Sequence, residues 1–172
     1  MSRDSDASKG VRQTQQLQEA PGCLLGWAAK ARSLYLDWKY GPIDSTASIG
    51  HRGEQAAARM LRRKGLNVIA HSESDRAGEI DLIAIDRQQK RIIFVEVKTL
   101  ATRKPGHPAE RVDQAKQDRV TRAALRYMKR NRILGIKARF DVVAVWWHDD
   151  APEPQRIEHY EAAFEASDFG IY

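Results

Sequence analysis

The sequence of 172 residues is 42% hydrophobic, which supplies the core of one domain with an appendage but no run of roughly 20 apolar residues for a membrane span. One cysteine, Cys23, excludes an internal disulfide and forms no zinc motif with the five scattered histidines, so we expect a cytoplasmic protein. The net charge of +6 is unevenly distributed, because residues 98 to 139 carry thirteen Lys and Arg against three acidic residues, a balance of +10. Such a block attracts a polyanion such as nucleic acid, although a solvated Arg-rich helix face has the same composition.

Residues 1 to 45 are predicted to be an N-terminal extension. The first 20 residues hold too few apolar side chains for a core, and we expect them to be disordered. From residue 24 to residue 40, apolar positions recur at spacings of three and four, which predicts an amphipathic helix that Gly41 and Pro42 end. This helix packs on the domain or on a partner chain, or else lies on a membrane surface.

Residues 46 to 172 are predicted to form the main domain, in which helical and strand patterns follow one another. Helical spacing covers residues 48 to 64, which Gly65 ends, and residues 109 to 132. Strand patterns cover residues 66 to 70, 79 to 85, 91 to 99 and 140 to 147. Residues 155 to 163 fit either an edge strand or a short helix. This order predicts an α/β fold in which helices flank a small mixed β-sheet.

Charged residues interrupt two of the predicted strands. Alternation places Glu96 and Lys98 on one face of their strand. If residues 79 to 85 and 92 to 98 form a hairpin, partners sum to 177, which sets Asp81 opposite Glu96 and Glu79 opposite Lys98. Two opposed carboxylates repel unless a cation lies between them, and hard oxygen ligands suit Mg²⁺ or Mn²⁺. Lys98 would then orient a water or neutralise a phosphoryl group beside the metal.

The sequence at this point resembles a known family. The segments Gly78-Glu-Ile-Asp81 and Glu96-Val-Lys98 are similar to the G-x-x-D and E-x-K signature of the PD-(D/E)XK nuclease superfamily, which has a restriction-endonuclease-like core. With Gly53-Glu54 before them and Lys116 and the strand RFDVVAV after them, the order resembles the YraN-like family over about residues 48 to 165.

The resemblance implies a metal-dependent nuclease that acts on DNA, with branched or junction structures among its candidate substrates. Asp81 and Glu96 would hold the metal with the Val97 carbonyl as a further ligand, Glu54 would match the carboxylate that the N-terminal helix contributes in related nucleases, and Lys98 would position the attacking water. Junction-cleaving relatives work as dimers, which implies a possible homodimer.

Glu54 can also be considered from its helical position alone. It shares a face with Ala57 and Leu61, so it points toward the buried side, where an unpaired carboxylate is costly. Two interpretations are open: Glu54 assists the metal site, or it pairs with Arg52 or Arg62. Glu79 similarly fits either an outer metal ligand or an ion pair with Lys98.

The predicted helix over residues 109 to 132 carries two sets of basic side chains. Lys116 projects toward the apolar stripe, where it either assists the site or extends past the end of the sheet. Four arginines spaced three or four residues apart form a separate ridge, which contacts phosphate or is only solvated: Arg119, Arg122, Arg126 and Arg130.

Three functions are consistent with these features. The first is the metal-dependent DNA nuclease. The second is a non-catalytic nucleic-acid-binding module with a nuclease-like fold, and the third is an adaptor that binds a protein partner through its N-terminal helix. A further carboxylate in a strand, Asp141, is predicted to make a structural bond to Arg139 or to a helix end rather than to bind metal.

Overall fold

A computed structural model describes residues 31, 34–75, 78–100, 113–148 and 151–166. The chain divides into two compact units, residues 1–35 and 36–172. Residues 31 and 34–40 are helical, as expected within residues 24 to 40. The rest of that expected helix, and the polar residues 1 to 20, lie outside the described residues. No helix in the described part of the chain has the length and apolar character that crossing a bilayer requires.

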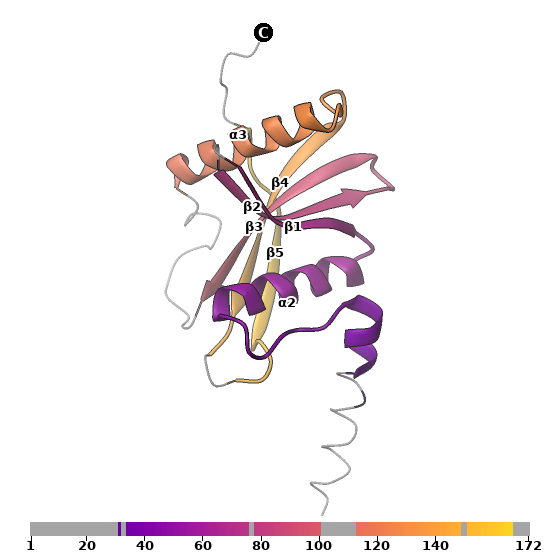
Figure 1. The fold of residues 1–172 in the computed structure, drawn as a ribbon, viewed down its shortest axis with the longest axis vertical. Coiled ribbons are helices and arrows are strands. Elements are labelled where there is room, and N and C mark those ends of the chain that lie inside the picture. Colours follow the sequence, from indigo (N-terminus) through magenta and orange to yellow (C-terminus); the bar gives the residue numbers. More distant parts are fainter. Residues whose placement is uncertain (1–30, 32–33, 76–77, 101–112, 149–150, 167–172) are drawn as a thin grey trace, which may run out of the picture. The chain divides into compact units, whose positions relative to one another are not determined.

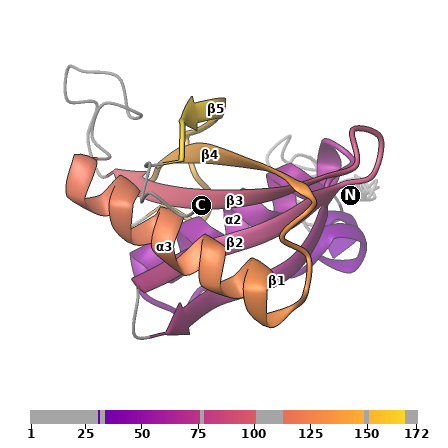
Figure 2. The ribbon, with the colours of Figure 1, turned by 90° about the horizontal axis from the view of Figure 1, so that it is seen from above.

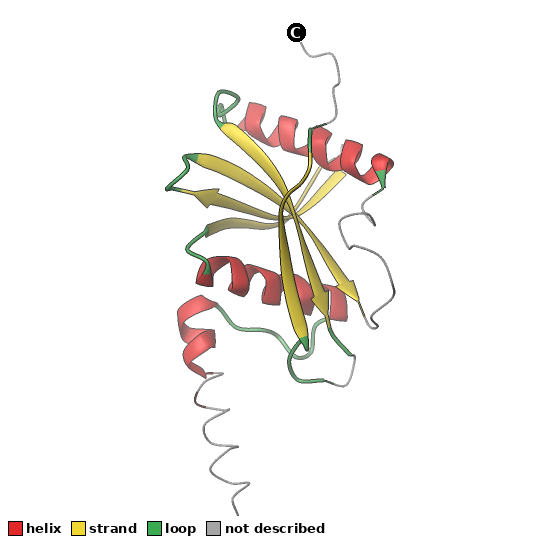
Figure 3. Ribbon diagram, turned by 180° about the vertical axis from the view of Figure 1, so that it is seen from behind, coloured by secondary structure: helices red, strands yellow, loops and turns green. Residues whose placement is uncertain are grey.

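The described part of the second unit contains two long helices and five strands (Figures 1 and 3). In chain order they are α2 (Ile49–Arg63), β1 (Asn67–Asp75), β2 (Gly78–Asp86), β3 (Arg91–Leu100), α3 (Gln114–Arg130), β4 (Lys137–Trp146) and β5 (Arg156–Phe164). The ambiguous segment over residues 155 to 163 is therefore a strand. Residues 109 to 112, where the second helix was expected to begin, lie outside the described residues.

The strands form one sheet in sequence order, β1-β2-β3-β4-β5. The β3–β4 pair is parallel and the other pairs are antiparallel, so the predicted mixed sheet is confirmed. Parallel neighbours need a crossover connection, and α3 lies in the connection between them. Figures 1 and 2 show α2 and α3 on opposite faces of the sheet, which gives three layers.

Each helix buries an apolar face against its own side of the sheet. Ala57 and Leu61 of α2 pack with Leu82 and Val95, whereas Val120 of α3 belongs to the cluster on the other face. That second cluster includes four aromatic rings: Phe140 stacks on Phe94 at 5.6 Å and on Phe164 at 5.1 Å between centroids, and Phe94 meets Tyr127 edge-on at 6.1 Å. Because both faces of β2 and β3 are covered, a charged side chain in the middle of these strands, such as Glu96, is buried.

The ends of α2 agree closely with the expectation from sequence. Ser48 caps the helix, because its Oγ accepts a hydrogen bond from His51 N at 3.4 Å. The helix ends at Lys64, and Gly65 follows with a φ of +86°, a conformation that glycine adopts without a Cβ clash.

Candidate functional site

The β2–β3 hairpin has the register predicted from the sequence. Leu82 pairs with Val95, and the ladder continues to Asp86 and Arg91 with partners that sum to 177. The paired ladder ends at Leu82, one residue before Asp81 would face Glu96. At this point Asp81 Oδ2 accepts a hydrogen bond from Val97 N at 2.6 Å. The side chain of Asp81 thus occupies the place where β2 and β3 part.

Glu96 is buried at this fork with a relative exposure of 2%. Its Oε1 accepts a hydrogen bond from Lys98 Nζ at 2.8 Å, and Lys116 Nζ lies 3.1 Å from its Oε2. The approach of Lys116 is an ion pair without hydrogen-bond geometry, so among the described residues Oε2 has no hydrogen-bond donor. A buried carboxylate oxygen that lacks a donor is costly to maintain, which makes it a candidate ligand atom.

The surroundings of Asp81 raise the pKa of its carboxyl group. Burial raises this pKa from 3.8 to about 7, and repulsion from Glu96 contributes to the same shift. The Val97 N–H and Lys116 oppose the shift without cancelling it. Because Asp81 Oδ2 is hydrogen-bonded to Val97, the residue after Glu96, the two carboxylates lie at one site, together with the two lysines that contact Glu96.

Glu54 reaches toward the same site from α2, on the other side of the sheet from α3. Its Oε2 accepts a hydrogen bond from Ser72 Oγ at 3.0 Å and lies 3.4 Å from His51 Nδ1, and its charge adds to the raised pKa of Asp81. Ser72 was not indicated by the sequence. It is a polar residue on β1 with a φ of +46°, a backbone conformation that is uncommon outside glycine.

The two arginines considered as partners of Glu54 make other contacts. Arg52 Nη2 donates to Ala151 O at 2.7 Å, and its guanidinium lies 4.3 Å from the centre of the Trp147 ring. Arg62 Nη1 donates to the backbone carbonyl of Tyr40 at 2.8 Å.

Gly78 brings the beginning of β2 close to α3. Its φ is +151°, and a Cβ at this position would lie 3.2 Å from Arg119 O. The backbone conformation and the close approach to α3 therefore explain why glycine occupies the first position of the G-x-x-D segment. Glu79, the next residue, is exposed and pairs through its backbone with Ser74. No hydrogen bond or ion pair between described residues joins Glu79 to Lys98.

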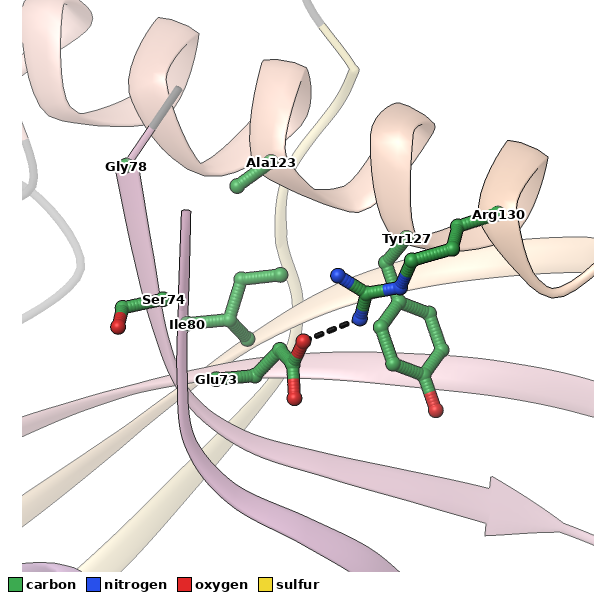
Figure 4. Close-up of a pocket in the computed structure, with 7 residues that line it drawn as sticks. All are labelled: Glu73, Ser74, Gly78, Ile80, Ala123, Tyr127 and Arg130. Carbon is green, nitrogen blue, oxygen red and sulfur yellow. Dashed lines mark hydrogen bonds and ion pairs between the residues drawn. The ribbon is translucent and has the colours of Figure 1, made fainter. Parts of the chain in front are cut away.

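The arginines of the predicted ridge are all exposed on α3: Arg119, Arg122, Arg126 and Arg130. Figure 4 shows the guanidinium of Arg130 directed at Glu73 of β1, with which it forms an ion pair. Arg130 also lies 5.5 Å from the centre of the Tyr127 ring. The C-terminal end of the ridge is therefore partly neutralised by an acidic residue, which the local sequence of the helix does not reveal.

The donor atoms at the fork suit a hard divalent cation. The carboxylates of Asp81 and Glu96 offer oxygen ligands, which Mg²⁺ and Mn²⁺ prefer, and Glu96 Oε2 has no hydrogen-bond donor among the described residues. Within the described ranges, no three His, Cys, Asp or Glu side chains are arranged to hold a metal by themselves. A bound cation would therefore also need the Val97 carbonyl, water or substrate oxygens, and Mg²⁺ often retains such ligands.

Asp141 has a structural role, as predicted from the sequence. Arg139 Nη2 donates to its Oδ2 at 2.9 Å, His159 Nε2 lies 2.8 Å from the same oxygen, and Ala162 N donates to its Oδ1 at 3.0 Å. Burial raises the pKa of Asp141, but hydrogen bonds from His159, Arg139 and Ala162 outweigh burial and lower it overall. The Asp141 carboxylate is therefore hydrogen-bonded within β4 and to β5, where it holds the two strands together.

Comparison with known proteins identifies the family. The model of the "Uncharacterised protein family UPF0102" matches residues 53–145, which contain all of α2 but its first four residues, the β2–β3 hairpin and α3. A UPF0102 protein of Rhodopirellula baltica is 66% identical over 137 residues, which cover 80% of this chain and 82% of that protein. A UPF0102 protein of Syntrophotalea carbinolica is 39% identical over 118 residues, or 69% and 92% of the two chains. One of Desulfosudis oleivorans is 41% identical over 111 residues, or 64% and 89%. The chain belongs to the UPF0102 family, the YraN-like family that its motifs resemble.

Proposed function

We propose that this protein is a metal-dependent nuclease that hydrolyses phosphodiester bonds in DNA, built on a restriction-endonuclease-like core. The observation that carries the proposal is the convergence of Asp81, Glu96, Lys98 and Lys116 at the point where β2 and β3 separate. Two close carboxylates repel each other when both are ionised, and a divalent cation bound between them would relieve that repulsion. The order of the elements around the hairpin, with α2 before it and α3 after it, also supports the proposed core.

Asp81, Glu96 and the Val97 carbonyl would hold the metal, with Glu54 assisting from α2. A bound Mg²⁺ or Mn²⁺ would supply a coordinated water of lowered pKa and positive charge near the phosphate oxygens. Glu54 already accepts a hydrogen bond from Ser72 of β1 and lies 3.4 Å from His51 Nδ1, so these residues hold its carboxylate without a cation. This arrangement fits an outer role for Glu54 better than a primary one.

Lys98 is proposed to position the attacking water and to neutralise charge that develops on the phosphate. Its ammonium is held 2.8 Å from Glu96 Oε1, so it is fixed beside the carboxylate at the centre of the site. Lys116 approaches the other oxygen of Glu96 from α3 and would help to neutralise the negative charge that develops on the phosphate. Stabilising charge in the transition state, rather than in bound substrate, is what raises the rate.

The exposed arginines of α3 are proposed to contact the DNA backbone. Arg119, Arg122 and Arg126 follow Lys116 along the helix at intervals of three or four residues, about 4.5–6 Å of helix rise, so they lead away from the site along one surface. Contacts of this kind position nucleic acid without reading its sequence. Glu79 at the exposed start of β2 would lie beside this path.

A nuclease assay with Mg²⁺ or Mn²⁺ tests the proposal. The substrates are linear duplex, single-stranded, flap and four-way-junction DNA, with a matched RNA, and the control protein is Lys98→Ala. Cleavage that requires the metal and is lost in the Lys98→Ala variant supports the nuclease. Salt-sensitive DNA binding by both proteins with no cleavage of any substrate would instead identify a non-catalytic nucleic-acid-binding module.

A further inference from the structure

A second feature lies at the opposite end of the β2–β3 hairpin from the carboxylates. A hollow of about 420 Å³ is formed by residues of β1, the hairpin and the connection between α3 and β4. Its lining residues are Ile69, Ile85, Asp86, Arg87, Lys90, Arg91, Ile92, Ile133 and Ile136. Along β3, Lys98 in the site lies six positions after Ile92 in the hollow, roughly 20 Å at strand spacing. An occupant of the hollow would leave the proposed nuclease site open.

The apolar surface continues past the rim of the hollow. Ile69 and Ile136 line it while remaining 43% exposed each, and Leu134, in the same loop as Ile136, is 58% exposed. Among the described residues after Trp38, these three are the large hydrophobic side chains that are exposed. Single exposed apolar residues need no explanation, but their concentration around one hollow marks an interaction surface.

Positive charge borders this surface on the hairpin side. Arg87 and Lys90 are exposed on the β2–β3 turn, and Arg91 lies beside them. Arg91 Nε is buried and has no hydrogen-bond partner among the described residues. The acidic residue of the lining, Asp86, is buried, and its Oδ1 accepts a hydrogen bond from Gln89 N at 2.9 Å, so it holds the turn. The accessible charge at the rim is therefore cationic.

We propose that this face docks an acidic amphipathic helix of a partner protein. Apolar side chains spaced i, i+3 or i+4, and i+7 would enter the hollow and cover Leu134, as in other helix-in-groove complexes. Glu or Asp side chains on the flank of that helix would face Arg87 and Lys90. The hollow has the volume of a ligand pocket, ~300–1,000 Å³, but a small amphiphile inside it would leave the apolar rim at Leu134 in water. Charge complementarity and the extent of the apolar rim favour the helix.

The test uses synthetic helical peptides as probes and does not depend on nuclease activity. An acidic peptide places Leu at i, i+4 and i+7 with Glu on the flanks; one control replaces each Glu with Lys, and another scrambles the Leu positions. Fluorescence anisotropy measures binding to the full-length protein.

The charge-reversal variant Arg87→Glu/Lys90→Glu is compared with Arg122→Glu/Arg126→Glu, which changes the net charge equally on α3. Ile136→Glu and the milder Ile136→Ser probe the hollow, with melting curves to verify folding.

The expected result is binding of the acidic peptide alone, weakened about tenfold or more by Arg87→Glu/Lys90→Glu and by both Ile136 substitutions, but not by the α3 control. Equal binding of the acidic and basic peptides, or no acidic-peptide binding at about 1 mM, overturns the proposal. Two further outcomes also overturn it. Sedimentation could reveal self-association that Ile136→Ser abolishes, which would assign the face to a second copy. Decanoate could bind one to one where the acidic peptide fails, which would assign the hollow to a small amphiphile.

Discussion

Gly53 of α2 lies so close to the Thr99 side chain of β3 that a Cβ on Gly53 would be 1.9 Å from Thr99 Oγ1. The neighbours of these two residues belong to the candidate site: Glu54 follows Gly53, and Lys98 precedes Thr99. The close approach therefore sets the spacing between the helix that carries Glu54 and the strand that carries Glu96 and Lys98. A side chain at position 53 would push these two elements apart.

We predict that Gly53→Ala destabilises the protein by about 1–3 kcal/mol, because overpacking outweighs the gain in helix propensity. Denaturant unfolding measures the change. Gly50→Ala is the matched control in the same helix, since a Cβ there meets no atom within 4 Å, and it should cost nothing. Thr99→Ala removes the nearest atom, so the double variant should recover part of the loss. Equal stability of the two alanine variants would contradict the close approach.

The sequence predicted the pairing of the β2–β3 hairpin better than the place where that pairing ends. The pairing of Leu82 with Val95 and the shared face of Glu96 and Lys98 follow from strand alternation and hairpin symmetry, which are local properties. The end of the ladder before Asp81 depends on how the strands diverge, and no local pattern encodes it. Nuclease chemistry, the metal and DNA contact stay predictions.

Contacts between distant elements could not be predicted from spacing. The first strand was predicted over residues 66 to 70, yet β1 continues to Asp75, because pairing with β2 overrides the weak strand preference of the polar residues there. Ser72 consequently reaches Glu54, eighteen positions earlier in the chain. Asp141 makes one contact that the sequence predicts and one that it does not. Its bond to nearby Arg139 was predicted, whereas its contact with His159 arises from the pairing of β4 with β5.

We predict that Asp81→Asn stabilises the protein at high pH. The pKa of Asp81 is raised to about 7 in the folded chain by burial and by Glu96, so the folded state holds a proton that the unfolded state has lost. Stability from this group is therefore greatest below pH 4 and decreases as the pH rises toward 7. Relative to the wild type, the variant should gain on the order of 2 kcal/mol at pH 8 and almost nothing at pH 4. Urea unfolding at both pH values measures this difference, and a pH-independent difference would argue against the raised pKa.

If the fork binds Mg²⁺, binding should release a proton from Asp81 below pH 7, because a cation favours the ionised carboxylate. Metal affinity should therefore increase with pH up to about 7 and then level off. Calorimetry at pH 6 in two buffers of different ionisation heat measures the released proton. Asp81→Asn should bind metal weakly with no pH dependence in this range, and unchanged affinity in that variant would place the metal elsewhere.

If the α3 arginines contact phosphate, replacing Arg122 and Arg126 with Ala should weaken DNA binding and reduce its salt dependence. Each lost phosphate contact should lower the slope of log affinity against log salt by about 1. The matched control is Arg63→Ala/Lys137→Ala, which removes the same charge from exposed positions on α2 and β4. Exposed helix positions tolerate Ala, so folding should persist. An unchanged slope, or equal loss in the control, would assign the ridge to ordinary solvated surface.

The last prediction separates metal binding from catalysis at Glu96 and Lys98, whose side chains lie 2.8 Å apart. Glu96→Gln keeps the shape of the side chain but removes a negative ligand, so metal affinity and cleavage should both decrease. DNA affinity without metal should hold or rise, because repulsion of phosphate is relieved. Lys98→Ala should leave metal binding intact, since it removes a neighbouring positive charge, and should abolish cleavage, because the proposed work of Lys98 is on the water and the transition state. Calorimetry measures metal affinity, anisotropy measures DNA binding, and the best-cleaved substrate reports activity.

Cleavage that survives Lys98→Ala would remove Lys98 from the mechanism. A wild-type protein that binds no divalent cation at about 1 mM, even with DNA present, would leave the non-catalytic binding module as the function of this fold.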